Sequence, residues 1–329
     1  MKTFISLSAL FLSLSLTAQT NPATWYLNDT SGNGIQSNNN TASGIASTAM
    51  GLATTASGDY STAMGRGTTA YEDYSIAMGY DTTASGIAST AIGENTEASG
   101  DYSTAMGLAT TASGDYSTTM GRGTTAYEDY STAFGRNTTA SGIVSTAMGL
   151  ATTASGKYST TVGFYTTASD RSSLVIGQYN LLGSTVTNSA TDFSTDNTAF
   201  VIGNGADSDN RSDALVVKFN GDATLAGNLN INSDARLKAN IVSLGSTLSK
   251  LLQIDGKSYT MKKDESEKQK IGLLAQDIEK VFPELVSESH GVKSVNYQGL
   301  VPVLINALKE QQSEIDELKT MLKAIIEKT

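Results

Sequence analysis

The N-terminal half of the chain is organised by a repeat of 14 residues. A bulky apolar residue followed by glycine recurs with this spacing, and alanine recurs in a second register. The glycines are Gly51, Gly65, Gly79, Gly93, Gly107, Gly121, Gly135, Gly149, Gly163 and Gly177. A unit this short cannot hold a helix pair or a propeller blade, but it suits one coil of a β-roll, with two strands of about five residues and two tight turns. The spacing therefore predicts a mainly β N-terminal part built from stacked coils.

Within each unit the residues around the glycine alternate in the manner of a strand, so that one set of side chains points inward and the other faces water. We expect the column of bulky residues that begins with Met50 to be core packing. Each coil carries only one large apolar side chain, and a single roll of this kind buries too little apolar surface to offset the entropy of ordering the chain. Lateral association of several rolls is therefore expected.

This repeat resembles the head of the YadA-type trimeric adhesins, whose SxAxGxxxxAxG pattern it matches over about residues 41–180. The resemblance implies a left-handed parallel β-roll and three chains around one axis. We divide the N-terminal part into a signal peptide at 1–18, a cap segment at 19–40, the β-roll at 41–182 and a β-rich neck at 183–232. In the neck, residues 199–205 read as one more coil, and Asn220-Gly221 is a hairpin signal.

Two groups of residues in this part are candidates for binding. Tyrosines recur near the turns, where they either stack from coil to coil or form exposed aromatic ladders suited to sugars. They are Tyr60, Tyr74, Tyr102, Tyr116, Tyr130 and Tyr158. The acidic segment 206–213 lacks the spaced glycine and the terminal glutamate of a calcium loop, so it reads as a solvated turn. We expect neither a bound metal nor a cofactor.

The first 18 residues are typical of a secretory signal peptide. Lys2 precedes an apolar run from Phe4 to Leu16, and the small residue Ala18 marks the expected cleavage site. The alternative for this run is a buried helix. The chain has no cysteine, which excludes disulfides and a lipid attached to cysteine. The net charge of −10 lies entirely in residues 1–232, so nucleic acid is disfavoured as a partner. We expect a secreted or cell-surface protein without an intrinsic membrane anchor.

The composition changes at Ser233 to charged and helix-forming residues. Ser233, Asp234, Arg236 and Lys238 form the pattern SDxRxK, and two further motifs follow at 271–286 and 295–310. On these motifs, residues 233–329 resemble the endosialidase-type intramolecular chaperone domain, a self-cleaving serine peptidase family found at the ends of phage tail spikes and other trimeric fibres. The resemblance implies an α/β domain that assembles three chains and is cut from them between Asn232 and Ser233.

The same resemblance makes Ser233 the nucleophile and Lys238 its base. A serine hydroxyl needs a neighbouring base, and a lysine can serve where burial or a nearby cation lowers its pKa. Arg236 is a candidate for that cation. Asp234 and Asn240 are candidates for orienting the site.

The residues themselves leave two other readings open. A Ser-His-Asp triad would need His290, the only histidine, which lies in a predicted hairpin tip and is a poor candidate. The segment SDARLK also reads as a helix N-terminus, with Ser233 as the cap and Lys238 as a surface charge.

The last segment carries apolar residues at alternating spacings of three and four, which predicts a coiled coil at about 300–327. The seam consists of Val301, Leu304, Leu308, Gln311, Ile315, Leu318, Leu322 and Ile325. Gln311 is a single polar layer that can set the register, and Pro302 places the helix start within a few residues of it. The seam alone does not specify a coiled coil of three helices, so the expectation of a trimer follows from the resemblance and from the β-roll.

The leading hypothesis is a secreted, homotrimeric, adhesin-like fibre whose C-terminal domain drives assembly and then releases itself. Its expected partner is a host-cell, glycan or matrix receptor. The alternative is a fibre with a polysaccharide-degrading or phage tail-spike-type activity. Glycan hydrolysis needs a pair of carboxylates around a cleft, whereas the acids of the roll are scattered at turns. The signal peptide argues against a phage fibre.

Overall fold

The computed structural model describes residues 26–27, 35–36, 39–185, 189–262 and 268–328. The expected signal peptide at 1–18 and most of the cap segment at 19–40 lie outside the described residues. The chain divides into two compact units, Met1–Leu229 and Asn230–Thr329. Among the described residues, no helix is both long enough and apolar enough to cross a bilayer.

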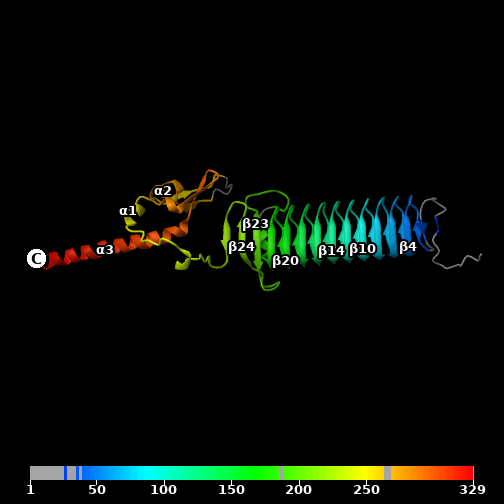
Figure 1. Cartoon of the computed structure of the whole chain (residues 1–329), viewed down its shortest axis with the longest axis horizontal. Coiled ribbons are helices and arrows are strands. Elements are labelled where there is room, and N and C mark those ends of the chain that lie inside the picture. Colours follow the sequence, from blue (N-terminus) through cyan, green and yellow to red (C-terminus); the bar gives the residue numbers. More distant parts are fainter. Residues whose placement is uncertain (1–25, 28–34, 37–38, 186–188, 263–267, 329) are drawn as a thin grey trace, which may run out of the picture. The chain divides into compact units, whose positions relative to one another are not determined.

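The first unit is a parallel β-solenoid with one 14-residue coil per sequence repeat, visible in Figure 1 as a row of stacked strands. Its long strands are Thr48–Leu52 (β4), Thr62–Arg66 (β6), Ile76–Tyr80 (β8), Thr90–Glu94 (β10), Thr104–Leu108 (β12), Thr118–Arg122 (β14), Thr132–Arg136 (β16), Thr146–Leu150 (β18), Thr160–Phe164 (β20) and Leu174–Gln178 (β22). They pair in parallel and in register, so that Met50 lies beside Met64 and Gly51 beside Gly65. Residues that are 14 apart in the sequence therefore pair with one another in adjacent long strands of the sheet.

The second strand of each coil is only two residues long, shorter than the five expected. These strands are Thr41–Ala42 (β3), Thr55–Ala56 (β5), Thr69–Ala70 (β7), Thr83–Ala84 (β9), Glu97–Ala98 (β11), Thr111–Ala112 (β13), Thr125–Ala126 (β15), Thr139–Ala140 (β17), Thr153–Ala154 (β19) and Thr167–Ala168 (β21), and they form a separate ten-stranded sheet. Turns at both ends of the short strand occupy the remaining residues. The long sheet is extended at its start by Tyr26–Leu27 (β1) and Ile35–Gln36 (β2).

The interior of the solenoid is lined by small side chains. Ala49 and Ala56 are fully buried, as are their equivalents in nearly every coil, together with the serines and threonines that precede the strands. The expectation that the Met50 column forms this core is wrong. Strand alternation directs Ala49 inward and Met50 outward, and a coil with so short a second strand leaves room inside only for small residues.

The outward column therefore forms a continuous strip on the outer face of the long sheet, which we call the apolar ridge. It consists of Met50, Met64, Met78, Ile92, Met106, Met120, Phe134, Met148, Val162 and Ile176, each half-buried or exposed. Exposed apolar strips of this length are unusual on a protein that functions as a single chain.

The glycine after each ridge residue is required by the stacking itself. At Gly107 φ is +128°, and a Cβ there would meet the carbonyl oxygen of Gly121 in the next coil at 1.9 Å. Any side chain at this position would push two coils apart.

The segment 183–232 continues the solenoid sheet. After Leu182–Thr185 (η1), Thr198–Asn204 (β23) pairs in parallel with β22, as the reading of 199–205 as one more coil anticipated. Asp213–Lys218 (β24) and Ala223–Leu225 (β25) then add an antiparallel hairpin that turns at Asn220-Gly221. The segment 206–213 forms a turn in which the Asp207 carboxylate accepts hydrogen bonds from the backbone N–H groups of Asp209 and Asn210.

The second unit mixes short helices, two hairpins and one long helix. Its elements are Ala235–Leu237 (η2), Leu248–Leu251 (α1), Lys257–Tyr259 (β26), Lys270–Gly272 (β27), Ala275–Val281 (α2), Pro283–Leu285 (η3), Val286–Ser289 (β28), Val292–Val295 (β29), Tyr297–Gly299 (η4) and Leu300–Ile326 (α3). Its core consists of Ile278, Phe282, Leu285, Leu300 and Val303. α3 starts two residues before Pro302, as predicted, because the helix there leaves the proline nitrogen without a required hydrogen bond.

Candidate functional site

Ser233 and Lys238 lie together at the start of the second unit. Lys238 Nζ donates a hydrogen bond to Ser233 Oγ at 2.7 Å. The single 3₁₀ turn η2 between them brings the two side chains together, because Lys238 N donates to the carbonyl of Ala235 at 3.1 Å and closes the turn. A hydroxyl and an amine within hydrogen-bond distance are the geometry that a serine nucleophile and a lysine base need.

Asp234 holds this turn in place. Its carboxylate accepts a hydrogen bond from Arg236 N at 2.9 Å and pairs with the Arg236 guanidinium, whose Nε lies 3.0 and 3.1 Å from the two carboxylate oxygens. The hydrogen bonds from the Arg236 side chain, followed by the one from its backbone, hold the pKa of Asp234 below its usual value. Asp234 is therefore the N-cap of η2, and the reading of Ser233 as a helix cap is wrong.

The other residues considered from the sequence lie apart from the dyad. Arg236 is engaged by Asp234, and in the part of the chain that the structure describes no hydrogen bond joins Asn240 to Ser233 or Lys238. Asn240 instead adopts a left-handed backbone, with φ of +53°. His290 sits at the tip of the β28–β29 hairpin, with Nδ1 2.9 Å from Ser289 Oγ, so its partner is not Ser233.

The dyad stands in an exposed segment. Every residue from 230 to 246 is exposed in the single chain, including Asn232, Ser233 and Lys238. In water a lysine amine carries a proton at neutral pH, and desolvation is what favours its neutral, proton-accepting form. The geometry of the dyad is present in one chain, while the dry surroundings that would activate it are not.

Glu310 anchors the segment that follows the dyad to α3. Its carboxylate accepts hydrogen bonds from Ser246 Oγ at 2.7 Å, Thr247 N at 2.6 Å and Leu248 N at 3.2 Å. These bonds, with that of Ser246 the strongest cause, lower the pKa of Glu310. Sequence reasoning missed this contact, because a glutamate on a charged helix gives no sign of a partner more than sixty residues away.

α3 presents two apolar stripes. Leu300, Val303 and Ala307 are buried against the domain core, and α1 packs on the same helix. The predicted seam forms the second stripe, and its apolar members from Val301 to Ile325 are all exposed. In the single chain the domain therefore covers one stripe only.

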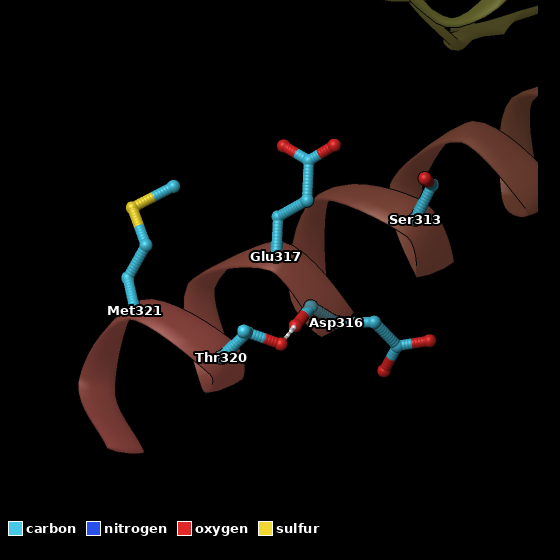
Figure 2. Close-up of a pocket in the computed structure, with 5 residues that line it drawn as sticks. All are labelled: Ser313, Asp316, Glu317, Thr320 and Met321. Carbon is cyan, nitrogen blue, oxygen red and sulfur yellow. Dashed lines mark hydrogen bonds between the residues drawn. The ribbon is translucent and has the colours of Figure 1, made fainter. Parts of the chain in front are cut away.

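The surface hollow on α3 shown in Figure 2 is not a binding site in one chain. It is lined by Ser313, Asp316, Glu317, Thr320 and Met321, which all project from the same helix. The hydrogen bond drawn there runs from Thr320 Oγ1 to the backbone oxygen of Asp316. Within the part of the chain that the structure describes, no second element lines this hollow. Among the described residues, no group of three or more acidic, histidine or cysteine side chains is placed to hold a metal ion.

Comparisons with known families identify both parts of the chain. Residues between 42 and 166 match the YadA head domain repeat in six segments, some of which overlap, and residues 233–287 match the family described as chaperone of endosialidase. The chain thus carries YadA-type head repeats followed by an endosialidase-type chaperone domain, as the sequence motifs predicted.

The similar curated proteins are phage fibres. Long tail fiber protein Gp37 of Salmonella phage S16 is 32% identical over 118 residues, which cover 33% of this chain and 16% of that protein. The protein of the same name from Enterobacteria phage M1 is 37% identical over 103 residues, which cover 28% of this chain and 40% of that protein. The chain therefore spans less than half the length of these relatives.

Proposed function

We propose that this chain, which joins YadA head repeats to an endosialidase chaperone domain, is a secreted homotrimeric adhesive fibre that cuts off its own C-terminal domain between Asn232 and Ser233. The observation that carries the proposal is the 2.7 Å hydrogen bond between Lys238 Nζ and Ser233 Oγ at the first residues of the chaperone match. The solenoid is the part that remains as the fibre.

The chemistry follows from the position of the serine next to the bond to be cut. Neutral Lys238 accepts the hydroxyl proton while Ser233 Oγ attacks the carbonyl carbon of Asn232. The bond from that carbon to the Ser233 nitrogen breaks, and the nitrogen takes the proton back from the lysine. The product is an ester between Asn232 and Ser233 Oγ, and water hydrolyses it to a free Asn232 carboxylate and a free Ser233 hydroxyl.

Two exposed apolar surfaces support assembly into a trimer. The apolar ridge runs the length of the solenoid, and the seam runs along α3 from Val301 to Ile325. Both would be covered by equivalent surfaces of two further copies around a common axis. Assembly that also covers the exposed segment 230–246 would remove water from the dyad, and cleavage would then follow assembly.

A C-terminal chaperone domain that is later removed would align the repeats of the three chains correctly. Residues 52–75 recur almost unchanged at 108–131, so chains displaced by four whole coils still match over much of their length. A seam at one end of the chain with a single polar layer at Gln311 fixes one alignment before the slow, non-local β-pairing begins. Once the aligning domain has been removed, separated chains cannot realign by the same route.

Mass spectrometry of secreted material tests the proposal. We expect a fibre fragment from Gln19 to Asn232 and a second fragment that starts at Ser233. Ser233→Ala should abolish cleavage because it removes the nucleophile, and Lys238→Arg should abolish it because a guanidinium stays protonated. Ser243→Ala, in the same exposed segment, is the matched control and should be cut normally. Efficient cutting of Lys238→Arg would reject the dyad.

A second candidate is a phage-type tail fibre, which the similarity to the Gp37 proteins favours. The N-terminus of the mature protein separates the two candidates. Removal of residues 1–18 during export from a bacterium supports the secreted fibre, whereas an intact Met1 in an assembled particle supports the tail fibre.

A further inference from the structure

The tyrosines at one corner of the solenoid form ladders along the stack of coils. Tyr60 and Tyr74 stack with ring centroids 5.3 Å apart. Tyr102, Tyr116 and Tyr130 form a second ladder with centroid distances of 5.0 and 4.9 Å and almost parallel planes. Within each ladder the ring faces cover one another, so only the end rings have a free face. The ladders are therefore poorly suited to sugars that stack on a row of open rings.

The two ladders are separated by one missing rung. Tyr74, Ala88 and Tyr102 hold equivalent positions in successive coils, with φ of +62°, +53° and +57°. The backbone continues through the gap without interruption, since Ala88 N donates to Asp73 O at 2.8 Å and Tyr102 N to Ile87 O at 2.7 Å. Two tyrosines, each the end ring of a stacked ladder, thus flank an alanine, in what we call the Ala88 slot.

The dimensions of the slot suit one flat group. Two coil spacings put the Tyr74 and Tyr102 rings about 10 Å apart. A planar group midway would lie about 5 Å from each ring, within the range of both aromatic stacking and cation–π attraction. The solvent-exposed fractions of the tyrosines are consistent with a free ring face on each side of the slot. Tyr116, whose ring is covered on both sides, is 49% exposed, whereas Tyr74 and Tyr102 are 58% and 53% exposed.

The charges around the slot favour a cation. Asp73 and Asp101 immediately precede the two wall tyrosines, and Glu72 adds a third acid. Each aspartate uses Oδ1 to accept a backbone N–H of the preceding coil, Asp73 from Asp59 and Asp101 from Ile87, and these bonds leave Oδ2 unused. In the corresponding turns of the described coils, the positions aligned with Asp73 carry no lysine or arginine before Lys157.

An equivalent tyrosine elsewhere in the solenoid shows which groups pack on its ring. Tyr158 occupies the equivalent position near the other end of the solenoid, where Lys157 and Arg171 replace the aspartates. Lys157 Nζ lies 5.1 Å from the centroid of the Tyr158 ring, and the Arg171 guanidinium carbon lies 5.3 Å from it. Where the chain supplies cations, they lie over the tyrosine ring.

We propose that the Ala88 slot binds the guanidinium group of an arginine side chain presented by a partner protein. The planar cation would lie between the Tyr74 and Tyr102 rings, beside the Asp73 and Asp101 carboxylates. The exposed side chain of Ile87 would contact the arginine methylenes. The proposal names an arginine side chain as the ligand of the adhesive head. All residues of the slot belong to one chain, so the proposal does not depend on cleavage of the C-terminal domain.

Saturation-transfer NMR on the intact secreted fibre tests the slot with the peptide acetyl-Gly-Arg-Gly-amide. The peptide with glutamine in place of arginine and methyl glucoside serve as neutral comparators. We expect only the arginine peptide to bind, and its affinity to fall as salt is raised. Ala88→Tyr, which inserts the missing rung, should weaken binding at least 10-fold. Tyr74→Ser, which removes one wall, should weaken it about 2- to 5-fold.

Ala46→Tyr is the matched control, because it adds a ring at the outer end of the Tyr60 ladder without entering the slot. It should bind the arginine peptide as the wild type does. Equal binding by Ala88→Tyr, no binding by the wild type, or equal binding of methyl glucoside would each overturn the proposal. Loss of assembly in Ala88→Tyr would also overturn it, since another copy of the chain would then fill the slot.

Discussion

Glu310 connects two parts of the C-terminal unit that are far apart in the sequence. Its carboxylate holds the N-terminus of α1, and Thr247 Oγ1 completes the junction by donating to the Val303 carbonyl at 2.9 Å. The segment between Lys238 and Ser246 has no regular secondary structure, and this junction joins its C-terminal end to α3.

Glu310→Gln should therefore lower the thermal midpoint of the C-terminal unit at pH 7. The folded-state pKa of Glu310 is lowered, so its contribution to stability is present above the ordinary glutamate pKa of about 4.3 and is lost as the pH falls through the lowered value. Melting curves between pH 7 and 3 should show the wild type losing its advantage over Glu310→Gln only at the acidic end. Glu314→Gln, on an exposed turn of the same helix, should change little; an equal effect there would contradict the junction.

Each coil of the solenoid depends on a glycine at which no other residue fits. The positive φ at Gly107 disfavours any side chain, and the Gly121 carbonyl oxygen would lie only 1.9 Å from a Cβ added there, which leaves no room for a methyl group. The small interior explains the rest of the coil, because alanine and short hydroxyl side chains fill the narrow space between the two sheets.

Gly107→Ala should consequently destabilise the fibre. The backbone conformation alone costs about 1–3 kcal/mol for a residue with a side chain, and displacement of the neighbouring coil adds to it. Gly183→Ala is the control, because a Cβ at Gly183 meets nothing within 4 Å. Unfolding in guanidinium chloride should show a lower midpoint for Gly107→Ala only. Equal midpoints for the two variants would mean that the coils can separate locally at little cost.

Assembly of the whole molecule should depend on the exposed stripe of α3. Ile315→Asp puts a charge into the middle of the seam, where three copies would bring three carboxylates together in an apolar layer. We expect this variant to be monomeric in sedimentation equilibrium and to remain uncut at Asn232-Ser233. Ser313→Asp adds the same charge two residues away, outside the seam, and should assemble and be cut. A trimeric Ile315→Asp would exclude the seam as the aligning element.

Much of the architecture could be predicted from the sequence. The 14-residue period is also the spacing of adjacent strands, so glycine and methionine columns in the sequence are columns in the sheet. The hairpin at Asn220-Gly221, the extra coil at 199–205 and the helix from Leu300 follow from local turn chemistry and periodicity, which act over a few residues. Ser233 and Lys238 of the SDxRxK pattern lie within hydrogen-bond distance for the same local reason, since one 3₁₀ turn separates them.

Only the tertiary structure decided which face of each strand is inside. Alternation shows that Ala49 and Met50 point to opposite sides, but the width of the space between the two sheets determines which side is the core. The contact of Glu310 with Ser246 likewise joins residues that the local sequence does not relate. Periodicity specifies neighbours along a strand and between coils, whereas the choice of core and the contacts across a fold depend on how much volume the packed elements leave between them.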